Sequence, residues 1–527
     1  MGEARGGVAG GRAMSRRGFL GAVAGVGVAV AGGGLGVAGC GVVRAETAGQ
    51  VLRSALPLPR RFGVPLPIPP TARPAAPGRY EVTQRVASVE IVPGTRTEVW
   101  GFDGIFPGPT FDLRRGERTT VRVRNELPVP TSTHLHGGVN PPESDGYPTD
   151  LVVAAGRGFR PPPGEHMDHD TVKWTFHSGV RDYVYPLDQP AATLWYHDHR
   201  MDFTAPQVWR GLAGFVLVRD DEDDALPLPK GERDLPLMIC DRAFEEDGSF
   251  RYPSKDRSLL VRAGIDDDYM EGVEGDVILV NGAPWPVHEV AAVRYRLRLL
   301  NASNARRYQL ELTPGGTFVQ VGSDAGLLAA PVRHQRIVIA PGERFDMVVD
   351  FSAYAVGTEV TMVNTLGEGA ARDVMRFRVT RKEKDDSAVP ARLSRLEPAE
   401  RAGAVATRVF DFRRTGHGSG AAWTVNGRRY RPGVPLARPR MGTTEVWRFT
   451  SDFHHPVHVH LAHFRVLSRG GKAPAATDAG WKDTVDVRPY EVVEVLVRFT
   501  GYRGLYMMHC HNLEHEDMAM MADFEIV

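Results

Sequence analysis

The sequence predicts an all-β protein built from three consecutive β-sandwich domains. Short segments in which apolar and polar residues alternate recur along the chain, and this alternation is typical of strands that bury one face. Glycine and proline are abundant, at 58 and 39 residues, and they supply the turns between short strands. Long helical periodicity is absent from the sequence. The 527 residues also exceed what one hydrophobic core organises, so several domains are expected.

One turn-and-strand pattern occurs three times, which indicates repeated domains. In each copy a glycine-containing turn precedes a short alternating strand. The three turns are Phe106-Pro-Gly-Pro-Thr-Phe111, Val280-Asn-Gly-Ala-Pro-Trp285 and Val425-Asn-Gly-Arg-Arg-Tyr430. The predicted ranges are 80–220 for domain 1, 233–380 for domain 2 and 405–527 for domain 3. Each range has the size of an ordinary domain.

Residues 1–45 have the features of an export signal. Ser15-Arg16-Arg17-Gly18-Phe19-Leu20 is a twin-arginine pattern, and a Gly- and Ala-rich apolar stretch follows it. Two processing patterns remain open. Val37-Ala38-Gly39-Cys40 has the form of a bacterial lipobox, which would attach the protein to a membrane through a lipidated Cys40, and Val43-Arg44-Ala45 has the form of an ordinary cleavage site. The protein is therefore expected in the periplasm, at the cell surface or outside the cell. The proline-rich residues 46–79 are expected to form an extended linker rather than packed structure.

The composition excludes two further classes. Basic and acidic residues balance at 64 each, so there is no overall electrostatic basis for binding nucleic acid. With only three cysteines the chain has no disulfide framework. Cys240 follows an apolar run and is expected in a core. Cys510 instead lies between two histidines, which is the context of a metal ligand.

Ten of the 18 histidines fall into four compact groups. The groups are His134-Leu-His136, His197-Asp-His199, His455-Pro-Val-His458-Val-His460, and His509-Cys-His511 with His515. Side chains at positions i and i+2 of a strand point to one face, so each His-x-His pair presents two imidazoles to one cavity. Four such pairs converge if domains 1 and 3 pack together. Imidazole suits copper, zinc, iron and nickel, and eight imidazoles exceed the needs of a single ion.

The tripeptide His509-Cys510-His511 predicts two kinds of centre. If both imidazoles face one way along a strand, the thiol faces the other and serves a different metal. His455, His515 and Met520 are available on that second side, with Met518 and Met521 as competitors for the axial position. Two histidines, a cysteine and a weak axial methionine make a blue-copper electron-transfer site. A zinc site, the main alternative, has a single four-coordinate centre and does not account for four pairs.

On these motifs the chain resembles the multicopper oxidase family, within the three-domain bacterial group of laccases, bilirubin oxidases and phenoxazinone synthases. The resemblance implies Greek-key cupredoxin domains and four coppers per chain. It assigns the type 1 copper to His455, Cys510, His515 and Met520, and the type 2 copper to His134 and His458. It assigns the type 3 pair to His136, His197, His199, His460, His509 and His511. Domain 2 carries none of these residues.

The resemblance also implies an activity. A phenolic, aromatic amine or tetrapyrrole donor would be oxidised one electron at a time at the type 1 copper, and O₂ would be reduced to water at the trinuclear cluster. Glu516 and Asp145 match acids that are proposed to relay protons in this family; the alternative is that they orient imidazoles by hydrogen bonds. Two other functions remain open, a cuprous oxidase for copper tolerance and a non-catalytic exported scaffold. Scattered methionines disfavour the first, and twelve intact ligand positions disfavour the second.

Overall fold

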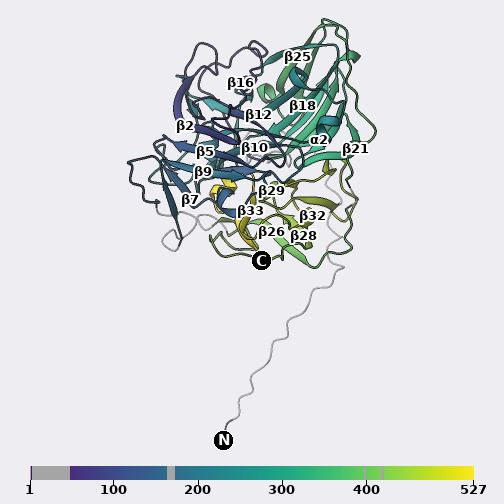
Figure 1. Cartoon of the computed structure of the whole chain (residues 1–527). Helices are drawn as coiled ribbons and strands as arrows, with labels where there is room; N and C mark the ends of the chain where they lie inside the picture. Colours follow the sequence, from purple (N-terminus) through teal and green to yellow (C-terminus); the bar gives the residue numbers. More distant parts are fainter. Residues whose placement is uncertain (1, 3–47, 163–171, 397–398, 417–420) are drawn as a thin grey trace. The chain divides into compact units, whose positions relative to one another are not determined.

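The computed structural model describes residue 2 and residues 48–162, 172–396, 399–416 and 421–527 (Figure 1). The chain divides into two units, residues 1–45 and residues 46–527, and all the described strands and helices belong to the second. The predicted export signal and Cys40 lie outside the described residues. Within the described part of the chain, no helix is both long enough and apolar enough to span a membrane.

Eight of the strands between residues 79 and 219 form two sheets that pack face to face. The first sheet has the order β3 (Thr97–Phe102), β2 (Arg79–Val89), β5 (Thr119–Asn125) and β9 (Val180–Tyr185). The second has the order β4 (Gly108–Arg114), β11 (Ala213–Arg219), β10 (Ala192–Asp198) and β6 (Thr133–His136). One apolar cluster joins Val82 and Val121 of the first sheet to Leu135 and Leu194 of the second. Domain 1 is therefore a β-sandwich.

Connections between these strands carry the short elements that matter for the site. They are η1 (Pro142–Ser144), the small parallel sheet of β7 (Asp150–Val153) and β8 (Thr175–Ser178), and α1 (Thr204–Trp209). A further short helix, α2 (Asp221–Ala225), follows β11.

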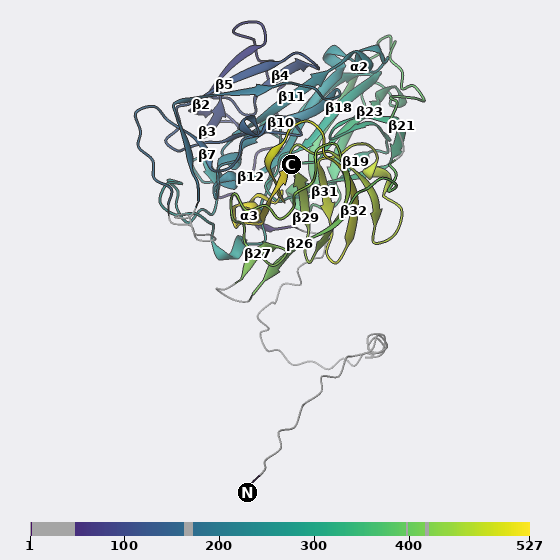
Figure 2. The same ribbon diagram turned by 60° about the horizontal axis from the view of Figure 1, so that its bottom comes forward.

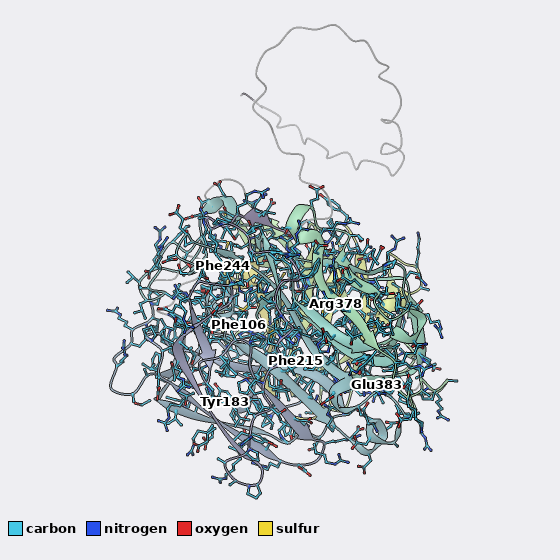
Figure 3. All side chains as sticks on the ribbon, turned by 90° about the horizontal axis from the view of Figure 1, so that it is seen from above. Phe106, Tyr183, Phe215, Phe244, Arg378 and Glu383 are labelled. Carbon is cyan, nitrogen blue, oxygen red and sulfur yellow. The ribbon has the colours of Figure 1, made fainter. Side chains whose placement is uncertain are left out.

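Domain 2 is also a pair of sheets. The larger has the order β16 (Ala283–Pro284), β15 (Val277–Val280), β12 (Asp234–Phe244), β18 (Arg294–Asn301), β23 (Arg344–Asp350), β20 (Phe318–Ser323) and β21 (Gly326–His334), with β13 (Phe250–Arg251) on β12. The smaller has the order β17 (Val287–Ala291), β25 (Asp373–Arg381), β24 (Glu359–Asn364), β19 (Tyr308–Thr313) and β22 (Arg336–Ile339). The core between them continues into domain 1, because it includes Trp195 and Phe215 as well as Leu297. Figure 3 labels Phe215 in this region.

Domain 3 repeats the two-sheet arrangement. Its first sheet has the order β27 (Ala422–Val425), β26 (Thr407–Thr415), β28 (Thr444–Ser451), β32 (Val492–Arg498) and β30 (Phe464–Arg469). Its second has the order β31 (Thr484–Val487), β29 (His455–Val459), β33 (Gly504–Cys510) and β34 (Met521–Ile526), and α3 (Leu513–Asp517) follows β33. Both ribbon views show the strands of domain 3, coloured green to yellow, beside the blue strands of domain 1 (Figures 1 and 2).

The three sandwiches share a pairing pattern. Their first long strands pair in parallel with the strand that follows the glycine-containing turn, as β2 with β5, β12 with β18 and β26 with β28. The turns at Asn281-Gly282 and Asn426-Gly427 have positive φ at both residues, which is the conformation that Asn-Gly adopts in tight hairpins. The all-β prediction with three sandwiches is therefore confirmed. The domain boundaries stay predictions, since residues 46–527 form one compact unit.

The expectation of an unpacked linker over residues 46–79 is wrong for its described part. Residues Gln50–Leu52 form β1, which pairs in parallel with β14 (Val273–Gly275). Leu56 and Leu66 lie in the core cluster of domain 2. Proline is compatible with this arrangement because its fixed φ suits an extended chain along a sheet edge, where its missing N–H leaves no partner unsatisfied. Cys240 is buried in the same core, as the sequence predicts.

Candidate metal centres

Strand β33 and the residue after it direct three consecutive side chains, those of His509, Cys510 and His511, to three separate groups of possible metal ligands. In the pairing of β33 with β29, His509 lies opposite His458 and Cys510 lies opposite Val457. The thiol of Cys510 points into the core of domain 3, and the imidazoles on either side of it point toward domain 1. This is the alternation on which the sequence-based hypothesis of two kinds of centre depends.

The first group joins the Cys510 thiol to two imidazoles. Cys510 Sγ lies 3.4 Å from Nδ1 of His455 and 3.6 Å from Nδ1 of His515, and the two nitrogens are 3.2 Å apart. The backbone N–H of Asn512 donates to the sulfur at 3.4 Å. Burial raises the pKa of the Cys510 thiol well above its ordinary value, so a thiolate here requires a bound cation.

Met520 lies next to this group through its backbone. Its N–H donates to the carbonyl of His515 at 2.9 Å, and its carbonyl accepts from the N–H of Cys510 at 3.1 Å. The side chain is fully buried. The indole of Trp423 covers His515, with ring centroids 3.8 Å apart, and is itself 2% exposed. The assignment of Met520 as axial ligand stays a prediction.

Three further groups consist of buried histidines from domains 1 and 3. In each, the ligand atoms lie within 4.8 Å of one another. The groups are His199, His460 and His509; His136, His197 and His511; and His134, His136 and His458. The closest approaches join Nε2 of His509 to Nε2 of His460 at 3.2 Å and to Nε2 of His199 at 3.3 Å. Strands β6 and β10 therefore present their imidazoles to those of β29 and β33, which is the convergence that the His-x-His pattern predicts.

Outer hydrogen bonds decide which nitrogen of each ring faces inward. Nδ1 of His134 donates to the carbonyl of Asp145 at 2.5 Å, and Nδ1 of His458 donates to the carbonyl of Asp483 at 2.9 Å. Nδ1 of His460 donates to Oδ2 of Asp145 at 2.7 Å. All three rings are thus left with Nε2 directed at the neighbouring imidazoles. Such partners fix the tautomer and the orientation of metal-ligating histidines.

His136 has the opposite arrangement. Its Nε2 lies 3.0 Å from Oδ1 of Asp483 and 3.0 Å from Oγ1 of Thr484, so Nδ1 is the nitrogen that faces inward. That Nδ1 has no hydrogen-bond partner, and neither do Nε2 of His197 and both ring nitrogens of His511. Buried polar atoms are normally satisfied, so these orphaned nitrogens fit a bound metal. Imidazoles with one thiol and no carboxylate in the inner positions suit copper.

Asp145 and Glu516 both contact the histidine groups from outside. Burial raises the pKa of Asp145 to about 8. Oε2 of Glu516 lies 3.0 Å from Nδ1 of His509, and Oε1 lies 3.6 Å from Nε2 of His199. Burial would raise the pKa of Glu516, but the adjacent His509 and His199 outweigh it and hold the pKa below its ordinary value. These positions accord with orienting imidazoles, and the proton-relay role stays a prediction.

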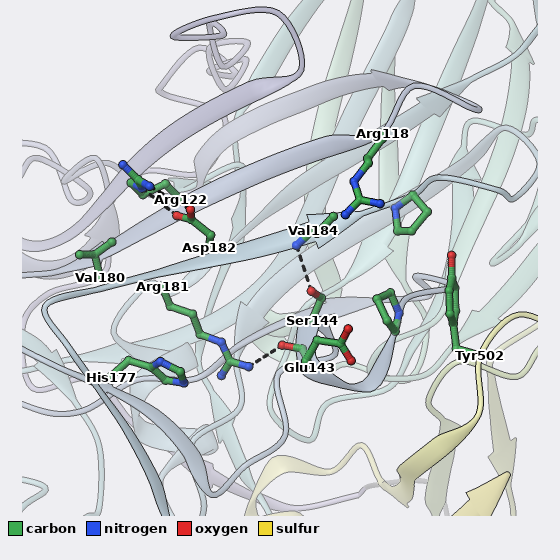
Figure 4. Close-up of a pocket in the computed structure, with 12 residues that line it drawn as sticks. Arg118, Arg122, Glu143, Ser144, His177, Val180, Arg181, Asp182, Val184 and Tyr502 are labelled. Atoms are coloured by element: carbon green, nitrogen blue, oxygen red, sulfur yellow. Dashed lines mark hydrogen bonds and ion pairs between the residues drawn. The ribbon is translucent and has the colours of Figure 1, made fainter. Parts of the chain in front are cut away.

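A cleft of about 750 Å³ lies beside η1 (Figure 4). Its walls include Arg118, Arg181 and Tyr502, and η1 contributes Glu143 and Ser144. Oγ of Ser144 accepts from the N–H of Val184 at 2.9 Å. Asp145 is the next residue after η1. The cleft wall is therefore adjacent in sequence to the residue that hydrogen-bonds His134 and His460.

Sequence reasoning missed a set of buried charges on the far side of the histidines. Asp483 is fully buried and forms an ion pair with Arg344, which comes from domain 2. Asp324, Glu343 and Lys482 lie beside them. The available signal is the pair Lys482-Asp483 directly before the valine-containing strand β31, because charged residues rarely enter a core without partners. Nothing in the sequence pairs Asp483 with a residue 139 positions away.

Comparison with known proteins gives one family. Two family models, both described as multicopper oxidase, match residues 406–527 and residues 84–161 with 170–223. A laccase of Bacillus stratosphericus is 35% identical over 89% of this chain and 99% of its own length. A bilirubin oxidase of Albifimbria verrucaria is 35% identical over 88% of this chain and 81% of its own length. The crystal structure of a multi-copper oxidase from Pediococcus acidilactici is 30% identical, superposes with a TM-score of 0.75, and covers 91% of this chain and 93% of its own.

Proposed function

This chain belongs to the multicopper oxidase family, and on that premise we propose that it is a laccase-like enzyme that couples one-electron oxidation of a small reducing substrate to the reduction of O₂ to water. The observation that carries the proposal is the placement of His509, Cys510 and His511 in three different ligand groups. One segment thus contributes to an electron-accepting thiolate site and to two histidine groups. It provides the covalent path for electron transfer that coupling donor oxidation to O₂ reduction requires.

The ligand sets follow from these groups. We propose four coppers per chain: a type 1 copper, a type 2 copper and a type 3 pair. The type 1 ligands are His455, Cys510, His515 and Met520. The type 2 ligands are His134 and His458. The type 3 ligands are His199, His460 and His509 for one ion and His136, His197 and His511 for the other. The three-residue groups within 4.8 Å support this division.

Bound copper would supply the one-electron redox chemistry and the site of O₂ reduction. The chain's own residues fix the geometry. Asn512 donates its N–H to the sulfur of Cys510, which stabilises the thiolate. The bonds from Cys510 to His509 and His511 provide the shortest covalent route between the two kinds of site. We propose that Asp145, whose carboxyl group contacts His460, and Glu516, whose carboxylate contacts His509, relay protons for O₂ reduction.

The donor is proposed to be a phenol, an aromatic amine or a tetrapyrrole. The names of two relatives, a laccase and a bilirubin oxidase, support these classes. The donor would dock on the surface above the type 1 ligands, since His515 and His455 are fully buried and Trp423, whose indole lies over His515, is itself only 2% exposed. The indole of Trp423 would then lie between the donor and His515.

A copper-loaded preparation tests the proposal directly. The visible spectrum should contain an intense blue band, and O₂ uptake should follow the addition of a phenol, an aromatic amine or bilirubin. A Cys510→Ser variant should lose the blue band and the oxidation of every donor. A colourless copper-loaded protein, or uptake with Cu(I) and with none of the organic donors, would contradict the proposal.

We also propose that the protein is exported through a twin-arginine signal and works outside the cytoplasm. The pattern Ser15-Arg16-Arg17 supports export, and Cys40 supports a lipid anchor as the alternative to cleavage near Ala45. Replacement of Arg16 and Arg17 by Lys should retain the protein in the cytoplasm. A Cys40→Ser variant separates the two alternatives: it should release the protein from the membrane fraction if Cys40 is lipidated, and change nothing if the signal is cleaved after Ala45.

A further inference from the structure

We infer that Arg344 of domain 2 positions the trinuclear copper site through Asp483, so that the domain without copper ligands forms one wall of the site. This inference rests on the proposed function. It assigns a role to a domain that contributes no residue to the candidate ligand groups among the described residues.

Arg344 is fully buried and uses all five of its N–H groups. Two of them donate to Asp483, from Nη1 to Oδ1 at 2.7 Å and from Nη2 to Oδ2 at 2.5 Å. The other three donate to backbone carbonyls: Nε to Thr193 at 2.9 Å, Nη1 to Gly342 at 3.0 Å and Nη2 to Asp324 at 2.9 Å. Thr193 belongs to β10 of domain 1 and Asp483 to domain 3. One guanidinium therefore joins all three domains.

Asp483 passes this constraint to two proposed copper ligands. Its Oδ1 accepts from Nε2 of His136 at 3.0 Å, and its carbonyl accepts from Nδ1 of His458 at 2.9 Å. The carboxylate thereby makes His136 present Nδ1 to the metal, and the carbonyl makes His458 present Nε2. A rotation of Asp483 would alter the nitrogen that His136 offers.

A second contact from domain 2 holds the backbone of the same segment. Oδ2 of Asp324 accepts from the N–H of Asp483 and from the N–H of Thr484, both at 3.3 Å. Its Oδ1 accepts from the N–H of Arg344 at 2.7 Å. Lys482 Nζ lies 3.0 Å from Asp324, which balances the charge. The start of β31 is thus fixed through both its side chain and its main chain.

The loop that precedes Arg344 packs directly on the proposed ligands. A Cβ atom on Gly342 would lie 2.9 Å from Cδ2 of His511 and 3.1 Å from Cε1 of His136. A Cβ atom on Gly137, next to His136, would lie 2.7 Å from both Nη2 of Arg344 and Oδ2 of Asp483. Two glycines on opposite sides of the contact allow the charged pair and the imidazoles to approach this closely.

A purely structural role is the competing explanation, because breaking any buried ion pair leaves an uncompensated charge. Arg296 provides the matched control. It is buried to a similar degree, and its hydrogen bonds go to Asp223 and Asp346, neither of which bonds a proposed ligand among the described residues. Loss of Arg296 should destabilise the protein without touching the copper spectra.

The experiment compares Arg344→Gln, Arg344→Lys, Asp483→Asn and Arg296→Gln in the copper-loaded full chain. The readouts are copper per chain, the type 2 hyperfine splitting in the electron paramagnetic resonance spectrum, the near-ultraviolet type 3 band and the blue band. We expect Arg344→Gln and Asp483→Asn to bind copper about 10- to 100-fold more weakly at the trinuclear site, as found for outer partners of metal ligands. Both should keep the blue band and change the type 2 splitting. Arg344→Lys, which keeps the charge and loses the paired geometry, should recover part of the copper.

An Arg344→Gln protein with full copper and unchanged type 2 and type 3 spectra would overturn the inference while leaving the proposed function intact. Equal spectral changes in Arg296→Gln would also overturn it. If Arg344→Gln does not fold, Asp483→Asn, which has the same shape as the parent, decides by the same criteria. A parent protein without a blue band would instead overturn the proposed function.

Discussion

Gly342→Ala should strain the trinuclear site through a single added methyl group. Gly342 has φ of +82°, so any side chain there adopts an unfavourable conformation, at a cost of about 1–2 kcal/mol. The added carbon would also lie 2.9 Å and 3.0 Å from Cδ2 and Cγ of His511. Relief of that overlap requires movement of a buried ring or of the loop, which adds about 1–3 kcal/mol.

Gly357→Ala separates the two costs. Gly357 also lies in domain 2 and has φ of +94°, but a Cβ atom there meets nothing within 4 Å. The difference between the two variants therefore measures contact with the histidines. Denaturant unfolding of the copper-free proteins gives the two free energies, and the near-ultraviolet type 3 band gives the state of the loaded site. Gly342→Ala should be less stable than Gly357→Ala by about 1–3 kcal/mol, and only Gly342→Ala should weaken that band. Equal stability together with equal type 3 bands would refute the packing argument.

Three further predictions concern the metal sites and a buried acid. Met520→Leu should raise the type 1 reduction potential and keep the blue colour, as measured by redox titration; an unchanged potential would move the axial role to another methionine. Glu516→Gln should bind full copper and turn over more slowly, and full copper with unchanged turnover would reject the relay. Burial raises the pKa of Asp523 to about 6, although Tyr147 and Tyr430 donate hydrogen bonds to it. Because the protonated acid is favoured in the folded state, its contribution to stability is present below about pH 4 and is lost as pH rises through about 6. Asp523→Asn should therefore show a smaller loss of unfolding free energy between those pH values, and an identical pH profile would contradict this.

The histidine groups could be predicted from sequence because they depend on local geometry. The alternation of side chains along a strand places His134 with His136 and separates Cys510 from its neighbours, and both relations need only adjacent residues. The tight turns are similarly local, as Asn281-Gly282 illustrates. The sequence predicts that the four His-x-His pairs converge only if domains 1 and 3 pack together. That packing is not encoded by any short motif.

The features that sequence reasoning missed or misjudged are long-range. Arg344 and Asp483 are 139 residues apart, and each alone is an ordinary charged residue in a β-rich chain. Leu56 and Leu66 enter the core of domain 2 because a hydrophobic surface is available there. Proline-rich composition predicts only the conformation of the local backbone. Burial against a distant partner is decided by the assembled tertiary structure.

The position of β33 near the end of domain 3 means that the last ligand residues are synthesised long after those of domain 1. His136 and His199 leave the ribosome several hundred residues before His511 and His509, the respective partners with which they share ligand groups. A nascent chain halted within domain 2 holds four of the eight imidazoles of the three histidine groups and lacks domain 3, which supplies the other four. The candidate histidine groups are consequently complete only after translation has delivered the last sandwich.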